Sequence, residues 1–167
     1  SNIHFCGSDI KVIGFTSCLP NEGKSSVAMN LAESLAAENL KVLFIDADLR
    51  RSVMLGRLKI DQKVNGLTLY LSGMQDIKDI IYETNVEGLD IVFAGPIPPN
   101  PSELLGGERF RELILELRNE YDYIIIDTPP LGSIIDSAVV ARICDGMVMV
   151  LEANSISYKF AQNVKKQ

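Results

Sequence analysis

The chain has 167 residues, of which 47% are apolar and 23% are charged, and it carries a formal net charge of −6. This composition predicts one globular domain with a buried core, and it argues against a disordered chain. The acidic balance argues against a nucleic-acid-binding surface, because duplex binding depends on Lys and Arg. The apolar runs are strand-sized, well below the ~20 residues that span a bilayer, so we expect no direct insertion into a membrane.

The three cysteines are too widely spaced to form a CxxC pair: they are Cys6, Cys18 and Cys144. The single histidine, His4, offers them no partner for a Cys/His metal site. We therefore expect free thiols in a reducing compartment.

The first fifty residues have the pattern of a strand, a helix and a second strand. Lys11 to Thr16 is a short apolar run that ends at a turn-rich segment, Ser17 to Gly23. A helix is expected from about Lys24 to Glu38, and Asn39 is suited to end it; Lys41 to Asp46 is the second apolar run. The helix has an apolar stripe at i, i+3, i+4 and i+7, formed by Ala28, Leu31, Ala32 and Leu35. Such a unit predicts two parallel strands joined by a right-handed crossover.

The middle of the chain predicts shorter elements. Two short helices are expected near Gly66 to Leu71 and Asp76 to Glu83, followed by a strand from Leu89 to Ala94. The Pro-rich segment 95–101 interrupts regular structure, and Ser102 is a candidate N-cap for a helix that ends near Glu120. The apolar stripe of that helix is formed by Phe110, Leu113, Ile114 and Leu117.

The last third again alternates strands with helices. Asp122 to Asp127 and Gly146 to Glu152 are expected strands, Ile134 to Ile143 lies between them as a helix, and a final helix is expected from Ser157. Nearly continuous apolar strands that alternate with helices predict a three-layer α/β fold, in which a mainly parallel central sheet is covered by helices on both faces.

The segment Glu22-Gly-Lys-Ser25 lies between an expected buried strand and an amphipathic helix, as in a phosphate-binding loop. Backbone N–H groups of such a loop converge on an anion, Lys24 can reach the outer phosphates, and the Ser25 hydroxyl can bind magnesium. A Gly-Lys-Ser tripeptide also occurs by chance, and Cys18 stands where the standard pattern has glycine. The expected nucleotide-binding residues of the loop are Asn21, Glu22, Gly23, Lys24, Ser25 and Ser26.

Two aspartates end apolar strands, Asp46 and Asp127. Open parallel sheets bind their ligands beyond the carboxyl ends of the strands, so both carboxylates should face one crevice. Ile124-Ile-Ile-Asp127 matches the Walker B pattern, whose Asp holds magnesium. The alternative for Asp127 is a helix or turn cap that follows a strand.

Asp46-Ala-Asp48-Leu-Arg50 adds a second carboxylate and a guanidinium to this end of the sheet. Phosphoryl transfer to a hydroxyl with a pKa near 10 benefits from a carboxylate that accepts the proton, and the developing negative charge benefits from a cation such as Arg50. The alternative is a solvated charged turn.

Together these motifs resemble those of the BY-kinases, the bacterial tyrosine autokinases of capsule and exopolysaccharide synthesis. Thr16 to Ser26 is similar to their Walker A loop, Val42 to Arg50 to their Walker A′ motif, and Ile124 to Pro130 to their Walker B motif. Ala94 to Leu105 is similar to a further segment of that family.

The resemblance implies a P-loop NTPase fold and transfer of the ATP γ-phosphoryl group to tyrosine hydroxyls in a neighbouring subunit. Lys24 would bind the phosphates, with Ser25, Asp46 and Asp127 at Mg²⁺. Asp46 or Asp48 would accept the proton, and the resemblance leaves open which of the two is the base.

The resemblance also implies partners and a location. These are a membrane-anchored activator of the polysaccharide co-polymerase type and the tyrosine-rich tails of neighbouring subunits, at the cytoplasmic face of the plasma membrane. The family's oligomerisation helix should precede Ser1, and its last strand and tyrosine-rich tail should follow Gln167. We therefore expect residues 1–167 to be a single P-loop kinase core.

Two other functions remain open at this point. Partition and septum-positioning ATPases of the same superfamily carry a signature lysine early in the loop, where this chain has Leu19. A non-catalytic nucleotide-binding regulatory subunit would be expected to have lost one of the residues Lys24, Ser25, Asp46, Asp48 and Asp127, all of which are present.

Overall fold

The computed structural model of the chain describes residues 10–18, 23–49, 65–130 and 134–151. The predicted last helix lies outside these residues. The described elements are, in chain order, β1 (Val12–Ser17), α1 (Lys24–Ala37), β2 (Val42–Asp46), α3 (Leu67–Leu71), α4 (Ile77–Ile80), β3 (Ile81–Glu83), β4 (Leu89–Val92), α5 (Pro101–Leu105), α6 (Glu108–Leu117), β5 (Tyr123–Asp127), α7 (Ile134–Ala141) and β6 (Gly146–Val150).

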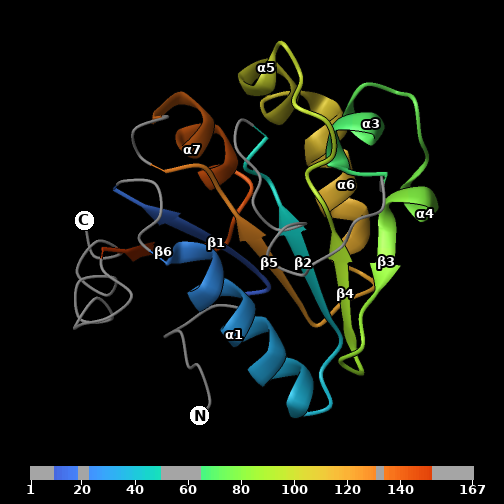
Figure 1. Cartoon of the computed structure of the whole chain (residues 1–167), viewed down its shortest axis with the longest axis vertical. Helices are drawn as coiled ribbons and strands as arrows, with labels where there is room; N and C mark the ends of the chain where they lie inside the picture. Colours follow the sequence, from blue (N-terminus) through green and yellow to red (C-terminus); the bar gives the residue numbers. More distant parts are fainter. Residues whose placement is uncertain (1–9, 19–22, 50–64, 131–133, 152–167) are drawn as a thin grey trace.

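The six strands form one sheet in the order β3-β4-β2-β5-β1-β6. All neighbours are parallel except β3, which pairs antiparallel with β4 at one edge. Helix α1 covers one face of the sheet, and α6 and α7 cover the other (Figure 1). The predicted three-layer α/β fold with a mainly parallel sheet is confirmed.

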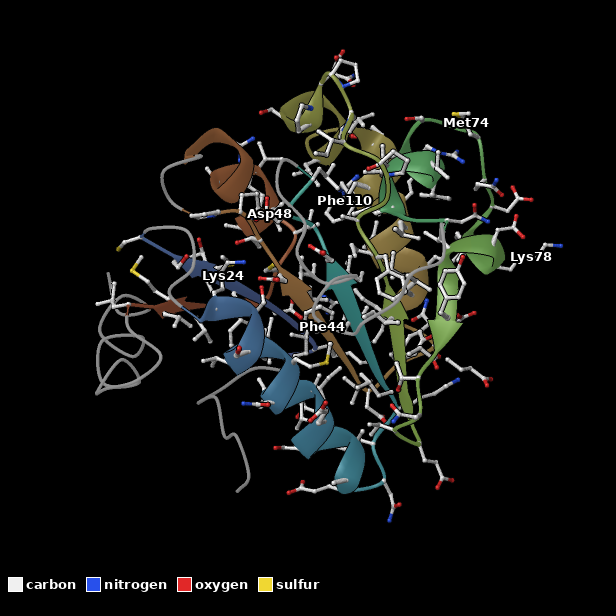
Figure 2. All side chains as sticks on the ribbon, viewed as in Figure 1. Lys24, Phe44, Asp48, Met74, Lys78 and Phe110 are labelled. Atoms are coloured by element: carbon white, nitrogen blue, oxygen red, sulfur yellow. The ribbon has the colours of Figure 1, made fainter. Side chains whose placement is uncertain are left out.

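The core has two halves because side chains of a strand alternate between the faces of the sheet. Phe44 points to the α1 side and packs with Ala28, Ala32 and other residues of the α1 stripe. Its neighbour Leu43 points to the opposite side, where it joins Phe110 and the rest of the α6 stripe. Figure 2 labels Phe44 and Phe110, one in each half of the core.

Helix α1 ends as its sequence predicts. Its last residue is Ala37, and Asn39 adopts a left-handed conformation with a φ of 64°. Asn tolerates this conformation better than most residues, and it allows the chain to turn directly into β2.

The predicted helix from Asp76 to Glu83 is wrong in its second half. Helix α4 ends at Ile80, and the next three residues form β3, with Ile81 opposite Val92 on β4. Ile81 and Tyr82 have high β propensity, and pairing with an edge of the sheet satisfies their backbone groups better than one more helical turn.

The predicted N-cap at Ser102 is also wrong, and the helix that follows is two helices. Asn100 is the N-cap residue, Pro101 starts α5, and Ser102 lies inside it. Gly106 and Gly107 separate α5 from α6, which ends at Leu117, a turn earlier than predicted. Pro fits the first turn of a helix because its missing N–H would be unpaired there, and two glycines weaken helix continuity.

Asp145 joins three segments at the amino end of the sheet. Its Oδ2 accepts hydrogen bonds of 2.9 Å from the backbone N–H groups of Lys11 and Val12, and of 2.9 Å from Arg118 Nη1. Burial raises the pKa of Asp145, but these bonds outweigh it and hold the pKa below its usual value. The neighbouring Cys144 is a free thiol whose pKa is raised to about 12 by burial and by Asp145. The entry to β1 therefore depends on an ionised Asp145.

We predict that Asp145→Asn lowers the free energy of unfolding by about 1–2 kcal/mol at pH 7. An unfolded Asp has a pKa of about 3.9, and the folded pKa of Asp145 is lower, so this stabilisation is complete above that value and is lost as the pH falls through the folded pKa. Urea unfolding of the wild type and of Asp145→Asn between pH 7 and pH 3 measures this difference in the free energy of unfolding. Asp122→Asn is the matched control, because Asp122 is exposed and accepts one backbone bond, from Lys41. An equal difference between wild type and Asp145→Asn at every pH would contradict the prediction.

Candidate functional site

Three strands bring the predicted site together at their carboxyl ends. Strand β5 lies between β1 and β2, with Asp127 opposite Phe15 on one side and opposite Asp46 on the other. The two predicted aspartates are therefore side by side, and the chain leaves β1 toward the phosphate-loop segment at the same edge. This is the edge at which open parallel sheets bind ligands.

Gly23 sets the entry into α1. It is the N-cap residue, with a φ of 78° that favours glycine, and its carbonyl accepts the N–H of Val27 at 3.0 Å. A side chain at this position would be strained, so Gly23 allows α1 to begin directly at Lys24. The N–H groups of its first turn and the positive end of the dipole of a fourteen-residue helix then face the carboxyl edge of the sheet.

Lys24 and Ser25 both contact Asp127. The Lys24 ammonium forms an ion pair with Asp127 Oδ1, and the Ser25 hydroxyl donates to Asp127 Oδ2 at 2.6 Å. Lys24 is 7% exposed and Asp127 is 2% exposed, so the pair is buried. Sequence analysis predicted these three residues from separate motifs 102 and 103 residues apart, and the structure brings them into direct contact.

The Asp46-Ala-Asp48 turn lies next to this contact. Asp46 is 2% exposed, and its Oδ1 accepts the N–H of Asp48 at 3.1 Å. The N–H of Ala47 donates to the carbonyl of Asp127 at 2.8 Å, which fixes the turn on the end of β5. Asp48 is half-buried, and Figure 2 shows it at the same end of the sheet as Lys24. The interpretation of this segment as a solvated charged turn is wrong for Asp46, because its side chain is buried.

The charges at this edge suit a divalent cation. Two buried carboxylates, Asp46 and Asp127, lie at this edge together with the buried Lys24 ammonium, and the Ser25 hydroxyl donates to Asp127. Oxygen donors of this kind are the ligands that magnesium prefers, with water and phosphate oxygens in the remaining positions. Among the described residues, no group of three or more His, Cys, Asp or Glu side chains could hold a metal without such help.

The remaining residues singled out from the sequence are not among these contacts. Ser26 lies in the first turn of α1 and is half-buried. Asn21, Glu22 and Arg50 lie outside the described residues. Cys18 contacts Met149, with 3.8 Å between the two sulfur atoms.

Sequence analysis missed two threonines at this edge, Thr16 and Thr128. Both are buried, at 4% and 0% exposure, and their hydroxyls connect β1 to the segment after Asp127. The sequence signal that could have pointed to these threonines is Pro129-Pro130. Prolines lack the N–H that a strand ladder requires, so side chains have to make the hydrogen bonds between the strands there.

The fold and the site define a P-loop nucleotide-binding domain. A sequence profile described as an AAA domain matches residues 10–166. The tyrosine-protein kinase CpsD of Streptococcus agalactiae is 46% identical over 167 residues, which are 100% of this chain and 73% of that protein. The tyrosine-protein kinase YwqD of Bacillus subtilis is 36% identical, over 99% of this chain and 70% of its own length.

Solved structures agree with these relatives. The kinase domain of the Escherichia coli tyrosine kinase ETK superposes with a TM-score of 0.83, with 32% identity over 95% of this chain and 62% of that one. The chain belongs to the bacterial tyrosine-protein kinases.

The septum-positioning branch of the superfamily is less similar. The septum site-determining protein MinD of Pyrococcus horikoshii, solved as a complex with Mg-ADP, has a TM-score of 0.72 and 25% identity over 93% of this chain and 65% of its own. Both branches share the fold, and the sequence identity of this chain is higher to the tyrosine kinases than to MinD.

We predict that Lys24→Met lowers the free energy of unfolding by about 3–5 kcal/mol, because it leaves the buried carboxylate of Asp127 without its cation. Adding Asp127→Asn to this variant removes the buried charge and should restore part of the loss. Urea unfolding of the wild type, both single variants and the double variant gives the coupling energy. Additive effects of the two substitutions would contradict the buried ion pair.

Proposed function

We propose that this chain is the catalytic core of a protein-tyrosine autokinase, which transfers the γ-phosphoryl group of ATP to tyrosine hydroxyls of neighbouring subunits with the help of Mg²⁺. The observation that carries the proposal is the contact of Lys24 and Ser25 with Asp127, beside the buried carboxylate of Asp46. Residues 1–167 would act as a single kinase core.

Each residue has a role that its position allows. Gly23 and the first N–H groups of α1 would bind phosphate oxygens, and Lys24 would bind the outer phosphates. Ser25, Asp46 and Asp127 would hold Mg²⁺, which neutralises charge on the phosphates. Asn21, Glu22, Ser26 and Arg50 would complete the nucleotide site.

The proton of the acceptor hydroxyl would go to Asp46 or Asp48. Asp46 is almost fully buried and already accepts the N–H of Asp48. Asp48 is half-buried and therefore more accessible to a hydroxyl that arrives from outside. Accessibility favours Asp48 as the base and Asp46 as the residue that orients it and the metal.

Three of the described tyrosines, Tyr70, Tyr82 and Tyr121, are poor acceptors, which favours a substrate tyrosine elsewhere. Tyr70 and Tyr121 are buried, and burial raises the pKa of both. The hydroxyl of Tyr121 donates to Asp90, and that of Tyr82 accepts the N–H of Asn65. A tyrosine-rich tail of a neighbouring subunit, as the sequence resemblance implies, would present hydroxyls that are free to react.

The cellular role that we propose rests on the same resemblance. The kinase would regulate capsular or exopolysaccharide synthesis and export, from the cytoplasmic face of the plasma membrane, through a membrane-anchored activator of the polysaccharide co-polymerase type. The free thiols of Cys18 and Cys144 fit a reducing compartment. In the part of the chain that the structure describes, no helix is both long and apolar enough to cross a bilayer.

The test is incubation of the full-length protein with γ-labelled ATP, Mg²⁺ and the cytoplasmic segment of its activator, followed by mass spectrometry of phosphorylated residues. We expect phosphotyrosine, and we expect Lys24→Met and Asp127→Asn each to lower its formation by about 100-fold or more, since each removes a charge that acts on the transferred group. Unchanged activity in either variant would contradict the assigned site.

The same assay separates the two alternatives. Release of free phosphate without phosphotyrosine would indicate an ATPase switch of the septum-positioning type. Nucleotide binding with neither product would indicate a regulatory subunit. The higher sequence identity to tyrosine-protein kinases than to the septum-positioning protein favours the kinase.

A further inference from the structure

Strands β1 and β5 stay connected beyond the end of their backbone ladder. The ladder runs from Val12 opposite Ile124 to Phe15 opposite Asp127. Strand β1 continues for two more residues, Thr16 and Ser17, which pair with β6 on its other side. On the β5 side, the residues that follow Asp127 are Thr128, Pro129 and Pro130.

Thr128, the first residue after β5, supplies the last backbone donor before the two prolines. Its N–H donates to the carbonyl of Phe15 at 2.9 Å, and its hydroxyl donates to the same oxygen at 2.7 Å. Pro129 and Pro130 have no N–H, so the ladder cannot continue through the backbone of this strand.

Thr16 continues the connection with its side chain. Its hydroxyl donates to the carbonyl of Pro129 at 2.9 Å. The two threonine hydroxyls therefore cross in opposite directions, one from the segment after β5 to β1 and one from β1 back to that segment. Both lie in the interior, where a hydrogen bond is shielded from competition with water.

We propose that Thr16 and Thr128 are positioning residues that hold the phosphate loop and Asp127 in the relative position needed for Mg²⁺ and nucleotide. We call this pair of residues the threonine clasp. Thr16 is two residues before Cys18, at the start of the loop, and Thr128 directly follows Asp127. The inference rests on the proposed function, because it concerns the same metal and phosphate site.

The clasp acts through other residues. Neither hydroxyl reaches the Lys24 and Ser25 contacts, which are made by the Asp127 carboxylate. A shift of β1 against β5 would move the loop and Asp127 apart, and sites that bind a metal between two segments are sensitive to shifts of about 1 Å. Loss of a clasp hydroxyl should therefore weaken the Mg²⁺-dependent part of nucleotide binding, which needs both segments at once.

The test uses Thr16→Val and Thr128→Val, which remove the hydroxyl and keep the shape of the side chain. The measurement is the affinity of the protein for ADP by calorimetry, with and without Mg²⁺, at a temperature well below the Tm of every variant. We expect each substitution to reduce the enhancement of ADP affinity by Mg²⁺ about five- to tenfold, the effect of one buried hydrogen bond. Thr128→Ser and Thr16→Ser keep the hydroxyl and should restore most of it.

Thr68→Val is the matched control. Thr68 is 5% exposed, and its hydroxyl donates to the carbonyl of Ala94 at 2.7 Å, so it loses the same kind of buried bond. Ala94 follows β4, which is separated from β5 by β2. Thr68→Val should lower the Tm about as much as the clasp substitutions and leave the Mg²⁺ enhancement unchanged.

The outcomes are distinct. Wild-type enhancement in both clasp variants, or an equal loss in Thr68→Val, would overturn the clasp and leave the proposed function intact. Failure of the wild-type protein to bind ADP more tightly with Mg²⁺ would overturn the proposed function and the clasp with it. If Thr128→Val does not fold, the comparison of Thr16→Val with Thr16→Ser tests the clasp by the same measurement of the Mg²⁺ enhancement.

Discussion

The structure depends on the parallel alignment of β1 and β5 at the centre of the sheet. This alignment joins the chain that leads into the phosphate loop to the strand that ends in Asp127. It makes possible the buried ion pair between Lys24 and Asp127 and the hydrogen bond from Ser25. A carboxylate that is 2% exposed is stable only with such partners, so packing of the central strands and chemistry of the site cannot be separated.

The elements with an unambiguous sequence pattern were predictable. Strands β2 and β5 are continuous apolar runs that end in an aspartate, and the stripe of α1 has a clear helical period. Strand β3 was missed because three residues give too short a pattern, and only its pairing with β4 makes it a strand. The break between α5 and α6 was missed because the apolar stripe of α6 masked the weakening effect of Gly106 and Gly107.

The sequence predicted which residues form the candidate site, but it did not predict how they contact one another. Lys24, Ser25, Asp46 and Asp127 follow from motifs and from the rule that ligands bind at the carboxyl ends of parallel strands. That Lys24 itself pairs with Asp127 depends on the neighbouring positions of β1 and β5, which the motifs do not specify. The roles of Thr16 and Thr128 required the hydrogen bonds, since an isolated threonine carries no motif.

The central claim is that the phosphate loop and Asp127 jointly form a metal and nucleotide site. Its most direct test is the anomalous scattering of Mn²⁺, used in place of Mg²⁺, in crystals of the protein grown with ADP. We predict one manganese ion bonded to the Ser25 hydroxyl and held by the Asp127 carboxylate directly or through one water, with the phosphates on Lys24. A manganese ion bound away from both residues, with ADP present, would contradict the account.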